Sequence, residues 1–280
     1  VFTKSVAWNG VCLATLRGVQ AFIAAGCMLR WRKVQLNKVK ILCAVCYFVQ
    51  GVLFMCANKY TTAGNATVLQ NMSPLYIILM NALINKKKPT KQELLVCLIL
   101  FIGIGLAFAG NLGGGAVLGN IFAILSALFY AGVYFFSKQE GADPLESLLL
   151  GNACYLFLIP VLMTSQTVLH TNLHDWVFIL FFGFLTGFGA WYCFSIGIRY
   201  ATALQASFIA LAEPVMAPLW TYIFLGEQLS PLSLAGFVIV IVTLLLNPQS
   251  HFAHGERETF YIYTFNHIQS IIEMDEFSCC

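Results

Sequence analysis

Charged side chains are scarce in this sequence. Only 10% of its 280 residues are Asp, Glu, Lys or Arg, whereas 59% are hydrophobic and the mean hydropathy is +0.80. A soluble domain carries about 25% charged residues. A chain so poor in charge does not cover a water-facing surface, so we expect its surroundings to be lipid. The net charge of +3 at pH 7 is also too small to indicate a nucleic-acid partner.

Sequence patterns for catalysis and metal binding are absent as well. There is no P-loop, G-x-S-x-G or H-E-x-x-H pattern, which leaves ATP-driven transport within this chain and intramembrane proteolysis without support. Cys43 and Cys46 form a C-x-x-C pair, but no second pair or nearby histidine completes a zinc site. His170 and His174 have no third ligand nearby. The sequence therefore predicts no metal, no cofactor and no enzyme activity.

What the sequence does contain is a duplication. Lys59–Ala63 is echoed by Arg199–Ala203 without a gap, and the same offset (199 − 59 = 140) pairs Pro74 with Pro214. Both copies are almost wholly apolar. Duplicated bundles of membrane helices are common in transporters, and the substrate site then lies at the seam between the two halves.

Nine apolar segments are each suited to cross a bilayer, which takes about 20 residues. Turn and charge signals separate them, and no long polar domain interrupts them. The predicted spans are Val11–Leu29, Val39–Ala57, Thr61–Ile84, Glu93–Gly110, Ala116–Phe136, Pro144–Met163, Asp175–Ile198, Thr202–Leu225 and Ser230–Asn247.

The first residues of the chain resemble the end of a further helix. Phe2-Thr3-Lys4 echoes Phe136-Ser137-Lys138, and Gly18 pairs with Gly151 at nearly the same offset. We therefore expect roughly 15 to 20 residues upstream of this sequence, most of one span. The predicted fold is an all-α integral membrane protein with ten helices in the full protein, nine of them complete here, arranged as two five-helix repeats.

The distribution of basic residues predicts the orientation, because Lys and Arg accumulate in short cytoplasmic loops. Counting the stub as the first helix, nine of the fifteen basic residues lie after helices two and four, within residues 30–40 and 86–91. Both ends of the full chain are then cytoplasmic. Since each repeat has an odd number of helices, the repeats are inverted, with Lys59 outside and its partner Arg199 inside.

Glu213 is the only acidic residue in the middle of a predicted span. Ionisable residues inside spans are energetically costly and usually functional. Glu213 could serve as a proton or substrate-cation site at the centre of the membrane. Alternatively, a neutral Glu213 hydrogen-bonds backbone groups freed by Pro214 and Pro218, which we predict to kink the helix, as we predict for Pro74 in the first copy.

Each copy also carries a pair of polar residues at the same place. Gln205 and Glu213 are about 80° apart on the helical wheel and about 12 Å apart along the axis, and their repeat partners are Asn65 and Ser73. Around a pseudo-two-fold axis, these four side chains are predicted to face one another across a cavity and to bind substrate.

Further polar and aromatic residues are candidates for substrate binding. Gln70 and Asn71 extend the polar face, although hydrogen bonding between helices is an equal alternative. Tyr134 and Trp191 are aromatic candidates for lining a pocket, although such residues more often pack or form interfacial belts. Arg17 could bind a carboxylate or phosphate, but its place near the start of a span favours an interpretation in which it extends to the outer interface.

These residues resemble a known family. Leu211–Pro218 followed by Phe224–Ser230 resembles the second repeat of EamA-type transporters of the drug/metabolite transporter superfamily. Thr61–Ala66 with Ser73-Pro74 resembles the first repeat. The resemblance implies a first repeat over residues 1–112, with its first helix truncated, a second repeat over residues 116–247, and a C-terminal tail over residues 248–280 that is not family-like.

The resemblance also implies a central cavity and the movement of small metabolites, often the export of amino acids or related compounds, without ATP hydrolysis. The expected partners are the lipid bilayer and a small-molecule substrate coupled to protons through Glu213, and a homodimer is compatible with this fold. The expected location is a bacterial cytoplasmic membrane, with several spans and a cytoplasmic C-terminus. The alternative is a non-transporting membrane protein, either a sensor or a degenerate remnant of a transporter.

Overall fold

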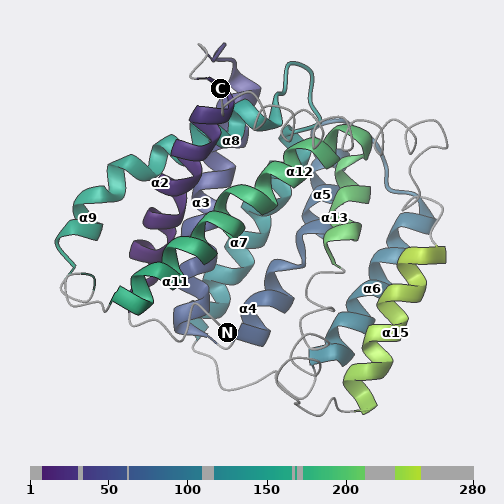
Figure 1. Cartoon of the computed structure of the whole chain (residues 1–280). Coiled ribbons are helices and arrows are strands. Elements are labelled where there is room, and N and C mark those ends of the chain that lie inside the picture. The colour runs from purple at the N-terminus through teal and green to yellow at the C-terminus, as the bar shows by residue number, and fades with distance from the viewer. Residues whose placement is uncertain are drawn as a thin grey trace, which may run out of the picture.

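The structure is a computed structural model that describes residues 8–30, 34–61, 63–108, 117–165, 168, 173–211 and 231–246. Within these ranges every regular element is a helix (Figure 1). The predicted all-α membrane fold is thereby confirmed. The helices are α2 (Gly10–Met28), α3 (Lys38–Tyr60), α4 (Ala63–Gln70), α5 (Ser73–Leu83), α6 (Lys91–Phe108), α7 (Val117–Phe136), α8 (Pro144–Ala153), η1 (Cys154–Leu158), α9 (Ile159–Met163), α11 (Leu173–Phe184), η2 (Leu185–Gly189), α12 (Ala190–Gly197), η3 (Ile198–Tyr200), α13 (Ala203–Ala210) and α15 (Pro231–Leu246).

Five helical stretches of the described chain are long and apolar enough to cross a membrane: Gly10–Met28, Lys38–Tyr60, Val117–Phe136, Pro144–Met163 and Ile179–Tyr200. The outer faces of the helices agree with this assignment. On α6, Leu95, Leu98 and Ile102 are all more than half exposed and share one face of the helix. Apolar faces of this kind are unfavourable in water and suit contact with lipid.

The 140-residue offset reappears in the ends of the helices. α4 and α13 cover equivalent residues, and α6 and α15 begin at the equivalent residues Lys91 and Pro231. α6 and α15 also pack side by side (Figure 1). A Cβ added to Gly103 of α6 would lie only 2.7 Å from Cγ2 of Val240, so the two helices are in close contact. Direct packing of equivalent helices is expected where two copies are related by an axis between them.

The predicted continuous span Thr61–Ile84 is broken in the structure. α4 ends at Gln70, Asn71 and Met72 form a turn, and α5 begins at Ser73. Pro74 explains the position of the break, because it has no amide hydrogen and its ring clashes with the carbonyl four residues earlier, which belongs to Gln70. α13 ends at the equivalent residue, Ala210.

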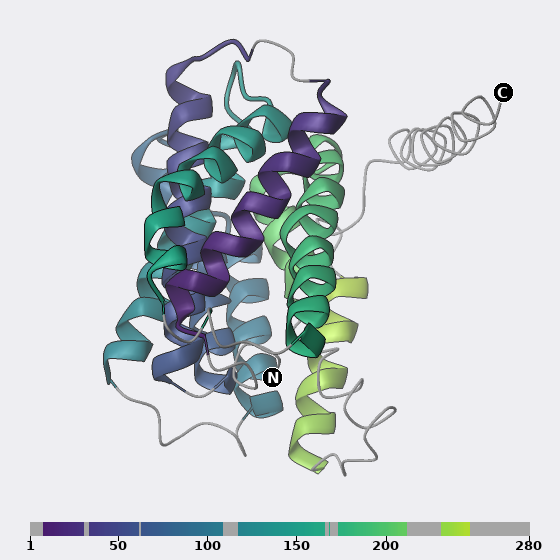
Figure 2. The same cartoon turned by 60° about the vertical axis from the view of Figure 1, so that its left-hand side comes forward.

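The predicted span Asp175–Ile198 is also less regular than expected. η2, between α11 and α12, is a π-helical turn over Leu185–Gly189. π-turns are rare and are found mostly as single turns inside α-helices, frequently at functional sites. Figure 2 shows α2 crossing beside the α11–α12 helix, and α2 contacts both α11 and η2.

Polar contacts join the helix ends on the side predicted to be cytoplasmic. Lys40 at the start of α3 forms an ion pair with Glu146 of α8, and its Nζ also donates to the carbonyl of Gln35 at 3.1 Å. Nζ of Lys138 donates to the carbonyls of Ile198 and Arg199 at 3.1 and 3.2 Å. The two Lys138 bonds satisfy carbonyls that the end of the α12–η3 helix leaves without a partner.

We expect Glu146→Gln to lower the free energy of unfolding by about 1 to 3 kcal/mol, because it leaves the Lys40 charge without its carboxylate. The Lys40 side chain is only 10% exposed and that of Glu146 only 23%. Arg199→Gln is the matched control, since it breaks the pair with Asp143 in which both side chains are more than a third exposed. Such exposed pairs contribute about 0 to 1 kcal/mol. Thermal unfolding in detergent would measure both variants, and equal shifts would contradict the prediction.

Candidate functional site

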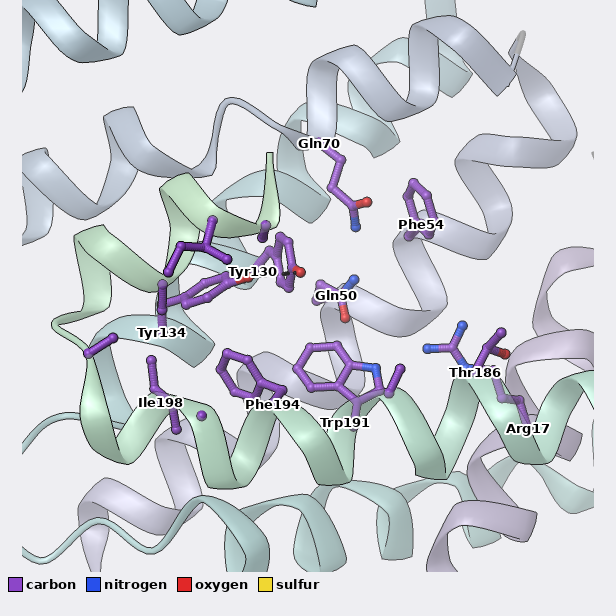
Figure 3. A pocket seen from close by; sticks show the side chains of 16 residues that line it. Arg17, Gln50, Phe54, Gln70, Tyr130, Tyr134, Thr186, Trp191, Phe194 and Ile198 are labelled. Atoms are coloured by element: carbon purple, nitrogen blue, oxygen red, sulfur yellow. Dashed lines mark hydrogen bonds between the residues drawn. The ribbon is translucent and has the colours of Figure 1, made fainter. Parts of the chain in front are cut away.

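A cavity of about 440 Å³ lies between the helices of the two copies (Figure 3). This volume falls within the range of small-molecule sites, about 300 to 1,000 Å³. Its walls come from α2, α3, α4, α7, η2, α12, η3 and α13. The lining residues are Arg17, Gln50, Phe54, Gln70, Tyr130, Tyr134, Thr186, Ala190, Trp191, Phe194, Gly197, Ile198, Ala201, Ala206, Ile209 and Ala210.

The lining contains equivalent positions of the two copies. At the offset of 140 residues, Phe54 pairs with Phe194, and both line the cavity. Two further lining pairs have the same offset, Gln50 with Ala190 and Gln70 with Ala210. The cavity is therefore built from the same places in both copies, but the first copy supplies amides where the second supplies methyl groups.

The side-chain amide of Gln70 begins a short chain of hydrogen bonds that reaches the backbone of Gln50. Nε2 of Gln70 donates to Oγ of Ser126 at 3.1 Å, and Oγ of Ser126 donates to the backbone carbonyl of Gln50 at 3.5 Å. Oε1 of Gln50 is buried without a hydrogen-bond partner among the described residues, and the residue is only 4% exposed. An unsatisfied buried acceptor costs about 1 to 3 kcal/mol, so this oxygen is available to a donor in the cavity.

Arg17 enters the cavity from the middle of α2, across the surface of η2. A Cβ added to Gly187 would lie 2.5 Å from Cγ of Arg17 and 2.9 Å from its carbonyl oxygen, so the glycine is what allows this close passage. Tyr47, which is buried, interacts with Arg17 and with Asn152. No acidic side chain in the described part of the chain forms an ion pair with Arg17.

Four aromatic rings form a closed cycle beside the cavity. Tyr130 contacts Tyr134, Tyr134 contacts Phe194, Phe194 contacts Trp191, and Trp191 contacts Tyr130. The ring centroids lie 4.9 to 5.9 Å apart, and every contact is edge-to-face. The hydroxyl of Tyr134 also donates to that of Tyr130 at 3.0 Å. The quartet is thus a rigid wall that presents both apolar and hydroxyl surface.

Comparison with known proteins identifies the family. The sequence profile of the EamA-like transporter family matches residues 1–109 and residues 117–247. The chain belongs to the EamA-like transporter family. Because both matched ranges belong to a transporter family and the chain has helices able to span a membrane, the protein is a membrane transporter by family. The resemblance to EamA-type transporters is thereby confirmed.

The relatives of this EamA protein are also named as transporters. An uncharacterized transporter of Archaeoglobus fulgidus is 25% identical over 252 residues, which cover 88% of this chain and 89% of that protein. The riboflavin transporter ImpX of Fusobacterium nucleatum subsp. nucleatum is 25% identical over 206 residues, or 69% of this chain and 68% of that protein. A crystal structure matches with a TM-score of 0.67 at 16% identity, covering 85% of this chain and 88% of the other, which shows a shared fold.

Three predicted substrate-binding residues of the EamA protein lie in the cavity lining: Gln70, Tyr134 and Trp191. Asn71 and Ser73 lie at the break between α4 and α5, and both are buried. Nδ2 of Asn71 donates to the carbonyl of Thr67 at 2.7 Å, so its amide stabilises the end of α4. Glu213, Pro214 and Pro218 lie outside the described residues.

Asn65 and Gln205 of the EamA protein lie near the start of α4 and α13, outside the lining of the cavity. Nδ2 of Asn65 donates to Oγ1 of Thr61 at 3.4 Å. Gln205 forms a capping box with Thr202. The side-chain Oε1 of Gln205 accepts from the backbone N–H of Thr202 at 2.8 Å, and the backbone N–H of Gln205 donates to Oγ1 of Thr202 at 3.2 Å. The side chain of Gln205 thus stabilises the helix start. The arrangement of four polar residues across the cavity stays a prediction, because it includes Glu213, which lies outside the described residues.

Arg17 and Gln50 are polar lining residues of the EamA protein that were not assigned to the site from sequence. Arg17 was expected to extend to the outer interface, but the structure places it in the lining. Gln50 was not a candidate at all, although the 140-residue offset that pairs Phe54 with Phe194 also pairs it with Ala190. The signal that could have revealed Gln50 is that it is polar while Ala190, its equivalent in the second copy, is apolar.

Proposed function

We propose that the protein is a secondary transporter that moves small metabolites by alternating access through the cavity between its two copies. The observation that carries this proposal is the paired lining, in which Phe54 and Gln50 of one copy line the same cavity as their equivalents Phe194 and Ala190. A site shared by two similar halves can open to either side when one half rocks against the other.

The chemistry of the lining argues against a non-transporting remnant or sensor. A degenerate cavity would be filled by large apolar side chains. This cavity instead keeps about 440 Å³ of space and exposes Arg17, Gln50 and Gln70 to it. Polar groups at membrane depth are energetically costly unless they serve a ligand or pathway.

The proposed arrangement in the membrane follows from helix order and charge. Equivalent helices are five spans apart, so α3 and the α11–α12 helix run in opposite directions if each span crosses once. The copies are then inverted. Lys86, Lys87 and Lys88 favour a cytoplasmic position for the loop between α5 and α6. We propose the cytoplasmic membrane of a bacterium as the location, with a cytoplasmic C-terminus.

The proposed substrates are amino acids or related small metabolites, and the proposed direction is export. The name of the relative ImpX states that it transports riboflavin, which supports a small organic molecule as the cargo of this fold. The cavity volume is in the range expected for such compounds.

Transport by the reconstituted full chain tests the proposal. Proteoliposomes loaded with a mixture of labelled amino acids, nucleosides and organic acids, without ATP, are expected to release at least one compound faster than protein-free vesicles. Counterflow with unlabelled compound should accelerate that release, which distinguishes a carrier from a leak. A rate equal to that of protein-free vesicles for every compound in the mixture would refute transport.

Glu213→Gln is expected to remove the pH dependence of this flux. The substitution keeps the size of the side chain and removes its ability to take up a proton. The measurement is the efflux rate of the transported compound from roughly pH 5 to pH 8 in wild type and variant. An unchanged pH profile would assign Glu213 a structural role beside Pro214.

A further inference from the structure

Arg17 brings a positive charge into the cavity without a counter-charge from the described lining. The sixteen lining residues include no Asp or Glu, and in the described chain no acidic group pairs with the guanidinium. Figure 3 shows Arg17 beside Thr186 at one end of the cavity. Because an unpaired charge at membrane depth is costly, a negatively charged ligand would stabilise it.

The position of Arg17 is peculiar to the first copy. Gly18 pairs with Gly151, so the residue equivalent to Arg17 is Leu150, which does not line the cavity. The fold of a copy therefore does not require an arginine here. Gly187 on the neighbouring helix leaves space for Arg17, since any side chain at that position would overlap the methylene groups of Arg17.

Gln50 lies between Arg17 and the rings and presents its amide to the cavity (Figure 3). Its Oε1 has no partner among the described residues, and the residue is only 4% exposed. A buried amide without a partner is destabilising. A ligand with an N–H or O–H group near its middle would satisfy this oxygen, and rotation of the amide would let it donate instead.

The aromatic quartet of Tyr130, Tyr134, Trp191 and Phe194 occupies the other end (Figure 3). Aromatic walls bind either organic cations through the ring faces or other flat rings through edge and face contacts. Arg17 in the same cavity repels a cation, because like charges are poorly screened away from water. The second class of ligand is therefore favoured.

We propose that the cavity binds planar aromatic compounds that carry a carboxylate or phosphate, with the acidic group at Arg17 and the ring at the quartet. This inference rests on the proposed transport function and specifies its substrate class.

A matched series of ligands tests the charge requirement. The three probes have the same ring and the same two-carbon chain but differ in charge. 3-Phenylpropionate carries a carboxylate, phenethylamine carries an ammonium group, and phenylalanine carries both. Binding to the full chain in nanodiscs, measured with labelled 3-phenylpropionate and competition by the others, should be at least about tenfold tighter for the carboxylate than for the amine. 3-Cyclohexylpropionate, which lacks the flat ring, should compete about three- to tenfold more weakly.

Arg17→Gln should weaken 3-phenylpropionate binding by about 10- to 100-fold and improve phenethylamine binding, because the variant removes both the anion partner and the repulsion. Arg17→Lys keeps the positive charge but loses the planar guanidinium group. Its affinity for 3-phenylpropionate should therefore lie between those of wild type and Arg17→Gln. Size-exclusion profiles and thermal unfolding establish that each variant is folded.

Two results would overturn the inference: tighter binding of the amine than of the carboxylate by wild type, or an anion affinity that Arg17→Gln leaves unchanged. The series also separates this inference from the transport function. If wild type binds none of the three probes but moves another metabolite in the efflux assay, the substrate class is wrong and transport stands. If 3-phenylpropionate binds through Arg17 but nothing is moved, the site is right and transport is wrong.

Discussion

Gly197→Phe is expected to lower the transport rate by about 10- to 100-fold, because the new ring occupies space that the substrate needs. Gly197 lies in the lining of the central cavity, and a Cβ added there meets no atom within 4 Å. Its backbone is helical, and phenylalanine is a better helix former than glycine. The variant should therefore fold normally and lose its function, which efflux from proteoliposomes would measure.

Gly105→Phe is the matched control for this substitution. Gly105 lies in α6, outside the cavity lining, and its surroundings are equally open, with no atom within 4 Å of an added Cβ. The same side chain is introduced into a helix of the same protein, but away from the proposed path. Transport by Gly105→Phe should remain near the wild-type rate. Equal rates for both variants would show that the substrate does not pass through this cavity.

Much of the fold could be predicted because the duplication and the length of the apolar segments can be read from the sequence alone. The 140-residue offset found at Lys59 and Arg199 predicts the equivalence of α4 with α13, and the two helices cover equivalent residues. The breaks within spans were harder to predict. Pro74 indicated a kink, but the turn at Asn71 and Met72 depends on how the ring meets the carbonyl of Gln70.

The site was predicted only in part, because polarity alone does not say which partner a side chain takes. Gln205 was expected to face the substrate, yet Thr202 three residues earlier offers a capping partner, and the local bond forms. From the sequence, Arg17 was assigned to the first part of its predicted span, Val11–Leu29, which favoured the interface. Its actual course depends on Gly187, 170 residues away in the sequence (187 − 17 = 170), where a missing side chain leaves room for it.

The two copies have become different in what they contribute to the cavity. The first supplies Arg17, Gln50 and Gln70, and the second supplies alanines at two of the equivalent positions together with most of the aromatic surface. Both copies supply the phenylalanine of the pair Phe54 and Phe194. The first copy thus provides the charge and the amides, and the second provides most of the aromatic surface. Such a division orients a ligand that is polar at one end and flat at the other.

Tyr155 connects α2 and α3, and its packing gives a second large effect. A Cβ added to Gly51 would lie 2.1 Å from the Tyr155 hydroxyl oxygen but 3.4 Å from Cζ, so only the hydroxyl is in conflict with it. Gly51→Ala should therefore destabilise the protein by about 1 to 3 kcal/mol through overpacking. Tyr155→Phe removes that oxygen, together with its 3.3 Å bond to the Phe48 carbonyl, at a cost of about 1 kcal/mol.

The double variant Gly51→Ala/Tyr155→Phe should be more stable than the sum of the single effects, by about 1 to 2 kcal/mol, because the methyl group occupies the space the hydroxyl leaves. Gly18→Ala is the contrasting case. Its Cβ would lie 2.1 and 2.2 Å from Cδ2 and Cγ of Tyr155, atoms that phenylalanine retains. Tyr155→Phe should therefore not rescue Gly18→Ala. Thermal unfolding of the six proteins in detergent measures both cycles, and equal coupling in the two would show that Tyr155 does not pack between these glycines as the structure has it.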